Sequence, residues 1–540
     1  MARVGLTISL LFSAFAHGAL VRRASPTVQL DYATYQGVRL DAGVDQYLGM
    51  RFAAPPLGDL RFRAPQDPGN TSTIQDASAF GPLCVGTGQT VDTGFRSEDC
   101  LFVNVFTPSN SDSTLKLPVW VYIQGGGYAW NSNGNYNGTD VIQNSGNGLV
   151  FVNFNYRVGL LGFLASQKVL ENGDLNAGLL DQRKVLEWVQ KYIHLFGGDP
   201  EHVVIQGASA GAGSVAQHLA AYNGRDDGLF VGAIAESTFW PTQRTVAEME
   251  PQYDLVVQNT GCAGTNDTLS CLRALDFSTI QAANVQSPFP GAPSQPVPLW
   301  YFLPVVDGSF ITGQLYDSFQ GGEIVKVPLL VGDDTNEGSG FAYNASTPEE
   351  VSVFMKANYP GLNSTQLEAI NDVYPLMAPV ALHAPYFPSA SAAYGESTFT
   401  CPGNHMAAGM ATYLSPDQIW NYHWNVQNPD DTSKGLGVVH TAETTAIFGY
   451  GYSANVPSFA SGSLNAPMVP ITMDYFISFV TTLNPNTQKN AAAPTWDGWG
   501  TGATGNRLKF ELNATVMEAI PEDQQQRCEF WQSLAPYLET

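Results

Sequence analysis

One short turn constrains the fold of this 540-residue chain more than any other segment, the Gly-Ala-Ser-Ala-Gly sequence at 207–211. An apolar run at 202–206 precedes it, and a helix-compatible stretch at 212–219 follows. A serine on a sharp turn between a strand and a helix is typical of a nucleophile elbow, where flanking glycines let the crowded backbone pass. The helix N-terminus offers N–H groups to a developing negative charge. The pattern predicts strand, turn and helix, with Ser209 as the candidate nucleophile.

A second glycine-rich turn lies upstream of this serine. The alternating apolar run at 118–124 ends in three glycines at 125–127. The span between the two turns allows another strand and helix, and a glycine triplet in this place supplies backbone donors for an oxyanion hole. Glycine suits the role because the backbone must approach a substrate closely. Gln124 stands where other loops of this kind carry histidine, which leaves the backbone donors in place.

A general base and an acid that orients it are expected after the serine, in the order acid and then histidine. Four histidines beyond the elbow are candidates for the base: His383, His405, His423 and His440. His423 lies inside a strand-like run at 419–426, and His405 lies at what reads as a helix start. His440 lies in a glycine-punctuated loop at 434–440, so the spacing favours His440.

The candidate acids follow a buried strand predicted at 327–332. Three carboxylates come directly after it, and the pattern leaves all three open: Asp333, Asp334 and Glu337. The chosen carboxylate must hold the imidazole in the correct tautomer and stabilise the imidazolium that forms.

Further motifs extend the pattern over nearly the whole chain, from about Leu30 to Leu538. They are the segments 52–62, 97–105, 155–159, 178–183, 196–200, 335–338 and 439–440. With these motifs the chain resembles the type-B carboxylesterase/lipase family, which also contains cholinesterases and secreted yeast lipases. The resemblance implies an α/β-hydrolase fold, with a large, mostly parallel central sheet flanked by helices and carrying cap and loop insertions. It predicts one such domain over residues 19–540.

The resemblance also implies the site residues. It assigns a catalytic triad of Ser209, Glu337 and His440, and oxyanion donors from the N–H groups of Gly126, Gly127 and Ala210. The family usually has glutamate just before the nucleophile, and this chain has Ala208, so the electrostatic tuning of cholinesterases does not carry over directly. No cofactor or metal is expected, because serine, imidazole and backbone dipoles supply the chemistry.

The N-terminus reads as a secretory signal at residues 1–18, with a cleavage boundary within 16–19. Arg3 precedes an apolar core at 4–15 that is too short to span a bilayer. A dibasic pair at 22–23 is a weaker candidate for processing. We therefore expect an extracellular protein without a stable membrane anchor. The formal net charge of −24 argues against binding nucleic acid, since acidic chains repel phosphate backbones.

Six cysteines in a secreted chain suggest three disulfides. The family pattern implies the pairs Cys84–Cys100, Cys262–Cys271 and Cys401–Cys528. Sequons for N-glycosylation occur at Asn70, Asn137, Asn266, Asn344, Asn363 and Asn513.

By resemblance, the expected reaction is ester hydrolysis through an acyl-enzyme. In the yeast lipases the first disulfide closes a long amphipathic flap, and in cholinesterases the same loop carries a tryptophan that binds a quaternary ammonium. Here the loop at 85–99 is short and mostly polar, and Phe95 is its one aromatic residue. These features favour a carboxylesterase for short or medium acyl chains, without interfacial activation. Aromatic residues near the motif ends are candidates for the pocket lining or for the core: Tyr128, Trp130, Phe239, Trp240 and Phe341.

Two alternatives stay open at this point. One is a lipase or sterol esterase acting on long-chain lipid esters, whose lid would lie in the insertion at 281–303. The other is a non-catalytic adhesion or binding relative, against which the intact Ser209, Glu337 and His440 argue. The sequence does not indicate an oligomeric state.

Overall fold

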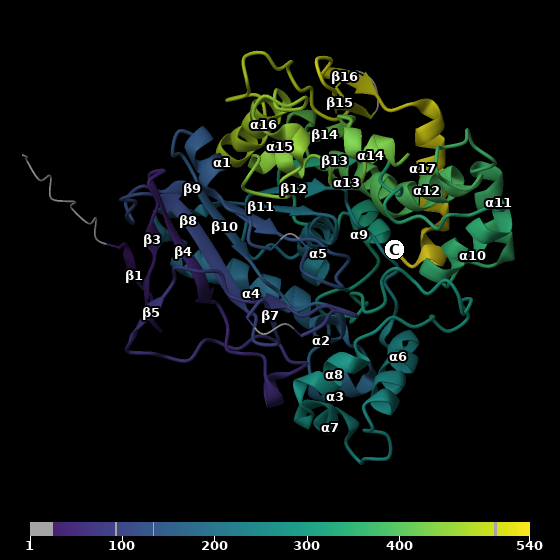
Figure 1. The fold of residues 1–540 in the computed structure, drawn as a ribbon, viewed down its shortest axis with the longest axis horizontal. Helices are drawn as coiled ribbons and strands as arrows, with labels where there is room; N and C mark the ends of the chain where they lie inside the picture. Colours follow the sequence, from purple (N-terminus) through teal and green to yellow (C-terminus); the bar gives the residue numbers. More distant parts are fainter. Residues whose placement is uncertain (1–24, 92–93, 133, 502–504) are drawn as a thin grey trace, which may run out of the picture.

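A mixed sheet organises the computed structural model, which describes residues 25–540 apart from 92–93, 133 and 502–504 (Figure 1). The predicted signal at 1–18 and the dibasic pair at 22–23 lie outside the described residues. In spatial order the eleven strands of this sheet are β16 (Val516–Ala519), β15 (Asn506–Phe510), β14 (Ile419–Trp424), β13 (Leu329–Asp334), β12 (Gly232–Glu236), β11 (Gly198–Ala208), β9 (Leu117–Ile123), β10 (Val150–Phe154), β8 (Phe102–Pro108), β4 (Val44–Arg51) and β3 (Val38–Arg39).

The strands from β15 across to β10 run parallel, and both edges of the sheet are antiparallel. Every residue of β12 and β13 is buried. Unbroken buried runs of this kind are typical of parallel strands that are covered on both faces. The mostly parallel central sheet predicted from the sequence is confirmed. Smaller strands lie outside it: β1 (Thr27–Gln29), β2 (Thr34–Gln36), β5 (Ile74–Asp76), β6 (Leu83–Cys84) and β7 (Arg96–Ser97).

Helices pack on both faces of the sheet, and strand β9 shows how the alternating side chains divide between them. Val119 and Val121 belong to the hydrophobic core that includes α4 (Ala177–Tyr192) and α5 (Ala210–Gly224). Trp120 and Tyr122 belong to the core that includes α1 (Thr139–Asn144), α15 (Thr444–Phe448) and α16 (Met468–Thr482). This alternation follows from the two-residue period of a strand.

Two long insertions between sheet strands contain most of the remaining helices. The segment between β12 and β13 holds α6 (Val246–Asn259), α7 (Thr268–Ala274), α8 (Phe277–Ala283) and α9 (Leu315–Gly321). The segment between β13 and β14 holds α10 (Pro348–Asn358), α11 (Ser364–Val373), α12 (Phe387–Gly395), the π-helical turn η3 (Glu396–Thr400) and α13 (Cys401–Ala411). The other helices are α2 (Gly159–Phe163), α3 (Gln167–Asn172), α14 (Pro429–Ser433) and α17 (Glu522–Leu538).

Three disulfides join parts of this framework, Cys84–Cys100, Cys262–Cys271 and Cys401–Cys528. These are the pairs that the family resemblance implies. The last one ties the start of α13 to α17, at the C-terminal end of the chain. Within the described residues, no helix combines the length and apolar character needed to cross a bilayer.

Candidate active site

The turn between β11 and α5 carries Ser209 in a strained backbone conformation. Its φ is 60° and its ψ is −127°, a region that residues with a Cβ rarely adopt. The turn packs closely on the end of β9, because a Cβ at Gly211 would overlap the carbonyl oxygen of Ile123. The Ser209 N–H donates to the carbonyl oxygen of Glu236 at 2.9 Å, which ties the turn to β12. Ala210 is the first residue of α5, so its N–H has no partner within the helix.

The glycine turn at 125–127 follows β9 and lies beside this elbow. The Tyr156 hydroxyl donates to the carbonyl oxygen of Gln124 at 2.9 Å and holds the start of the turn. Gly126 and Gly127 both have positive φ, 116° and 62°. A Cβ at Gly127 would overlap the ring of Trp300, so no larger residue fits there. The structure therefore places the three predicted oxyanion donors on adjacent segments.

Glu337 and His440 meet in a short hydrogen bond. The His440 Nδ1–H donates to Glu337 Oε2 at 2.5 Å. The other oxygen, Oε1, accepts the backbone N–H of Asp334 at 2.9 Å, so both oxygens of the buried carboxylate are engaged. With Nδ1 protonated, Nε2 is the basic nitrogen, and it is buried without a hydrogen-bond partner in the described part of the chain. This tautomer is the one that a general base requires.

Ser209 Oγ and His440 Nε2 form no hydrogen bond to each other within the described residues. Contacts of this kind are often long in a protein without substrate and tighten in the substrate complex. The elbow and the histidine are connected instead through packed rings. Phe399 lies 4.2 Å from His440 and 5.6 Å from Phe239 between ring centroids, and the Phe239 backbone packs against α5 at Gly213.

The other two candidate acids form no hydrogen bond with the His440 ring in the described structure. Asp333 is buried 3.8 Å from the guanidinium of Arg507. Asp334 Oδ2 accepts from the Ser237 hydroxyl at 3.2 Å and from the Ala442 N–H at 3.3 Å. The sequence pattern left open which of the three carboxylates binds the histidine. In the structure only Glu337, of these three, forms a hydrogen bond with His440.

The other three candidate histidines have partners elsewhere. Nε2 of His383 contacts the Lys434 carbonyl, Nε2 of His405 contacts the Tyr316 carbonyl, and Nδ1 of His423 contacts Glu518. Burial also lowers the pKa of His405. Among the four candidates, only His440 binds the catalytic acid candidate.

Known proteins with similar sequences show the family of this chain. The model of the carboxylesterase family matches residues 24–531. The chain belongs to the carboxylesterase family. Lipase 2 of Geotrichum candidum is 31% identical to it, with 88% of this chain and 90% of the relative covered. Secreted lipase 1 of Botryotinia fuckeliana is also 31% identical, with 89% of each chain covered.

A solved structure agrees with the family assignment. The crystal structure of Aspergillus niger EstA superimposes with a TM-score of 0.93 and is 58% identical in sequence. The match covers 96% of this chain and 99% of the other. The α/β-hydrolase fold predicted from the sequence is therefore confirmed, and the protein is a carboxylic ester hydrolase of the carboxylesterase family.

Near Glu337 and His440 of this carboxylesterase lies a cluster of three buried carboxyl groups that the sequence pattern did not predict as a cluster. Glu236 ends β12, Asp334 ends β13, and Glu443 follows His440 by three residues. Burial, and then repulsion from Glu443, raises the pKa of both Glu236 and Asp334 well above the usual range. Burial raises the pKa of Glu443 to about 7, although the Tyr422 hydroxyl donates to it at 2.6 Å. The cluster therefore retains protons around neutral pH.

One oxygen of each of these three carboxyl groups is buried and has no hydrogen-bond partner among the described residues. The described residues also contain no group of three or more His, Cys, Asp or Glu side chains arranged to hold a metal ion. An acid three residues after the candidate base, at the start of a short helix, is the sequence signal by which Glu443 could have been found.

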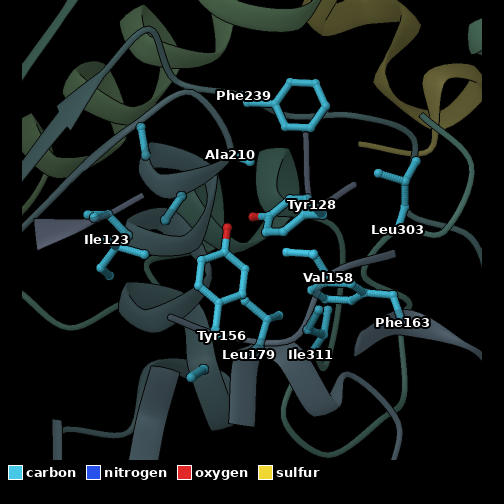
Figure 2. Close-up of a cluster of buried hydrophobic side chains, with 14 of the residues drawn as sticks. Ile123, Tyr128, Tyr156, Val158, Phe163, Leu179, Ala210, Phe239, Leu303 and Ile311 are labelled. Carbon is cyan, nitrogen blue, oxygen red and sulfur yellow. The ribbon is translucent and has the colours of Figure 1, made fainter. Parts of the chain in front are cut away.

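Aromatic side chains enclose the site. Figure 2 shows Tyr128, Tyr156 and Phe239 packed in one cluster with Ala210 of the elbow. Tyr128 and Phe239 have ring centroids 6.0 Å apart. Phe341 lies 5.1 Å from the ring of His440, so this candidate does border the histidine.

Trp130 and Trp240 have different surroundings. The ring of Trp130 lies 5.2 Å from that of Trp300, which covers the glycine turn. Trp240 is fully buried against Tyr316 and α9, so it is a core residue. The sequence motifs did not indicate Trp300 and Phe399 as residues of the site, because neither stands at the end of a recognisable motif.

The candidate glycosylation sites differ in accessibility. Asn137 is half-buried, and its side chain accepts the Thr139 N–H at 2.9 Å. The other five sequon asparagines are exposed: Asn70, Asn266, Asn344, Asn363 and Asn513. Their occupancy stays a prediction.

Proposed function

We propose that this protein is a secreted serine esterase that hydrolyses carboxylic esters with short to medium acyl chains, using Ser209, His440 and Glu337. One observation carries the proposal, the hydrogen bond from His440 Nδ1 to Glu337, which leaves Nε2 buried and without a partner among the residues that the structure describes. A serine on a strained turn, with glycine N–H groups on the adjacent segment, supplies the remaining parts. Secretion rests on the predicted signal and on relatives that are named secreted lipases.

In the proposed acylation step, Nε2 of His440 takes the proton of the Ser209 hydroxyl while its oxygen attacks the ester carbonyl carbon. The negative charge that develops on the carbonyl oxygen is bound by the N–H groups of Gly126, Gly127 and Ala210. Glu337 stabilises the imidazolium through Nδ1. The tetrahedral intermediate then collapses, the ester C–O bond breaks, and His440 returns the proton to the leaving alcohol.

In the proposed deacylation step, a water molecule gives its proton to His440 Nε2 and attacks the acyl carbonyl. The same N–H groups bind the second oxyanion. The bond to Ser209 breaks, the serine recovers its proton from the imidazolium, and the carboxylic acid leaves. Each residue is used twice, so the enzyme is regenerated without a co-reactant other than water.

The preference for short acyl chains rests on how tightly the proposed site is enclosed. Trp300 lies directly over Gly127, and Phe341 and Phe399 both face the ring of His440. The buried Trp300 also donates from Nε1 to the hydroxyl of Tyr394 at 3.0 Å, which fixes its ring. Bulky, fixed rings beside the reacting carbonyl leave little room for a long chain.

A lipase is the second candidate, because several relatives are named lipases. Its lid was expected at 281–303. The described structure anchors the end of this segment: residues 300–303 are buried, and the Tyr301 carbonyl accepts from Gln252 at 2.7 Å. The Leu299 N–H donates to Asn358 at 2.9 Å. These anchors favour a fixed wall over a mobile lid.

Initial rates on p-nitrophenyl esters of increasing acyl length, below and above each ester's solubility limit, test the proposal. We expect kcat/KM to be highest for acetate to butyrate, to fall steeply for long chains, and to show saturation that begins below the solubility limit. A sharp rise in rate when a substrate passes its solubility limit would instead favour the lipase.

A further inference from the structure

A cavity of about 740 Å³ lies against the loop that carries Glu337. Its walls are the loop at 335–339, residues 432–437 of the loop that leads to His440, helix α12, the start of α17 and the segment at 373–380. Ser209 and His440 do not line it, whereas Glu337 does, so the cavity lies behind the proposed ester site and shares the acid's loop with it.

Two buried polar atoms in the cavity wall have no hydrogen-bond partner among the described residues, Ser339 Oγ and Gln524 Oε1. Ser339 is only 6% exposed. A buried hydroxyl without a partner is costly to the folded state, so such groups are usually satisfied by water or by a ligand. The Ser339 hydroxyl can donate or accept and the Gln524 amide oxygen accepts, which suits a molecule with a hydroxyl group.

The charged groups of the cavity are already paired with each other. Arg527 donates to both oxygens of Glu396 and to Asp523, at 2.7 to 2.8 Å. Glu337 is engaged by His440 and by the Asp334 N–H. The described lining therefore offers no unpaired cation to an anionic ligand, and its three carboxylates would repel one. The charges therefore select against fatty acids and in favour of neutral molecules.

The remaining wall is largely apolar. Met377, Ala378, Val380 and Phe387 line it. The segment that carries the first three also exposes a large apolar side chain to solvent, Leu376, which is 59% exposed, and Leu382, two residues beyond the segment, is 79% exposed. A concave, mostly apolar site of several hundred cubic ångströms with a few convergent polar atoms is typical of small-molecule sites.

The cavity also contacts the elements that position the proposed triad. The two loops in its wall are joined by reciprocal hydrogen bonds, in which the Asn336 N–H donates to the Val438 carbonyl and the Asn336 side chain accepts the Val438 N–H, each at 2.9 Å. In η3, Glu396 and Thr400 line the cavity while Phe399 packs on His440. A π-helical turn inside a helix often marks a functional site.

We propose that this cavity is a second binding site, for a neutral amphipathic molecule such as an aliphatic alcohol, and that its occupancy changes turnover by shifting the loops that hold Glu337 and His440. The ligand places its chain against Met377 and Val380 and its hydroxyl at Ser339 or Gln524. Apart from Glu337, whose two oxygens are already engaged, the cavity residues are not part of the proposed catalytic machinery. Binding to the cavity is measured without any reaction.

The test uses 2-methylnonan-2-ol, a tertiary alcohol too hindered to accept an acyl group. Calorimetric titration is carried out on the full-length wild-type protein, on Ala392→Trp, which fills the cavity from α12, and on Leu382→Trp, which adds the same ring at an exposed position two residues beyond the wall segment. Ser339→Ala removes the unpartnered hydroxyl. We expect binding to wild type and Leu382→Trp, at least tenfold weaker binding to Ser339→Ala, and none to Ala392→Trp. Decanoate should bind at least tenfold more weakly than the alcohol.

Turnover of a dissolved butyrate ester gives the second readout. Saturating alcohol should change kcat at least twofold in wild type and in Leu382→Trp, and leave kcat of Ala392→Trp unchanged. The proposed site would be wrong if the alcohol did not bind to wild type, if it bound to Ala392→Trp as tightly as to wild type, or if decanoate bound more tightly than the alcohol. Binding with an unchanged kcat would overturn its coupling to the loops. Absence of all esterase activity would contradict the proposed function but would leave the titration interpretable.

Discussion

Glu337 accepts the Nδ1–H of His440 at 2.5 Å while its second oxygen accepts the N–H of Asp334 at 2.9 Å. The carboxylate is thus fixed from two sides, by the end of β13 and by the histidine loop. A fixed carboxylate holds the imidazole in one orientation and keeps Nε2 available as a base.

Glu337→Gln should lower kcat by about ten-thousandfold, because the amide stabilises the wrong tautomer of His440. KM for a short ester should change little, since Glu337 does not contact substrate. Asp333→Asn is the matched control, because this neighbouring carboxyl is buried beside Arg507 and does not reach the histidine. Steady-state kinetics on both variants checks the assignment. An equal loss of kcat in a folded Asp333→Asn protein would contradict it.

Gly127→Ala should lower kcat by about a hundredfold or more, because the new methyl meets the ring of Trp300 and moves a proposed oxyanion donor. Gly228→Ala is the matched control. Gly228 has a nearly equal φ of 66°, and a Cβ there meets nothing within 4 Å. It should lose about 1 kcal/mol of stability, because alanine is strained at a positive φ, and keep its kcat. Wild-type kcat in Gly127→Ala would rule out this turn as the oxyanion site.

The buried carboxyl cluster predicts a pH dependence of stability. The pKa of Glu443 lies at about 7 in the folded protein, above its ordinary value of 4.5. Between these two pH values the folded state keeps a proton that the unfolded state has lost, so stability falls as pH rises through this window. Glu236 and Asp334 act in the same direction. Tm measured from pH 4.5 to 7.5 should decline less steeply in Glu443→Gln than in wild type. An identical decline in both proteins would contradict the account.

Glu518 should have the opposite effect on the pH dependence of stability. Hydrogen bonds and charge interactions with His423 and Arg507 outweigh its burial and lower its pKa to about 2, below its ordinary value of 4.5. Its contribution to stability is present above pH 4.5 and is lost as pH falls through 2. Glu518→Gln should flatten the acid side of the Tm profile and leave the change between pH 5 and 7 as in wild type. Reversed effects of the two variants would show that the pKa directions are wrong.

The disulfides should differ in how much each contributes to the free energy of unfolding, because they close chain loops of different lengths. Cys401 and Cys528 are 127 residues apart, whereas Cys262 and Cys271 are 9 residues apart. Loop entropy predicts losses of about 5 and about 2.5 kcal/mol when each pair is replaced by serine. Denaturant unfolding of the two double variants, compared with wild type, measures the difference. A smaller loss from the long-range pair would contradict the entropic account.

Local segments of the fold could be predicted because their signals are contiguous in sequence. The strand, the turn at 207–211 and the following helix lie within one short segment, and the structure has them as β11 and α5. The glycine turn after β9 is equally local. In each case two backbone segments approach closely, and only glycine fits there, so the requirement is visible in the sequence.

The rest of the site depends on contacts between distant segments. Asp333, Asp334 and Glu337 follow the same strand, so spacing alone could not choose among them, and the decisive contact comes from His440. The cluster of Glu236, Asp334 and Glu443 forms only when β12, β13 and the histidine loop pack together. The hydrophobic periodicity of the sequence does not predict contacts between such distant segments. Phe399 reaches His440 through a π-helical turn, whose register the helical pattern does not reveal.

The identity of the nucleophile is the central claim, and covalent labelling tests it most directly. The purified protein is inactivated with an alkyl fluorophosphonate, digested, and mapped by mass spectrometry. We predict one adduct per chain, on the peptide containing Ser209, formed in proportion to the loss of activity. Ser209→Ala should be folded, with a Tm near that of wild type, and should show neither adduct nor esterase activity. A stoichiometric adduct on another serine, or substantial activity in purified Ser209→Ala, would contradict the account.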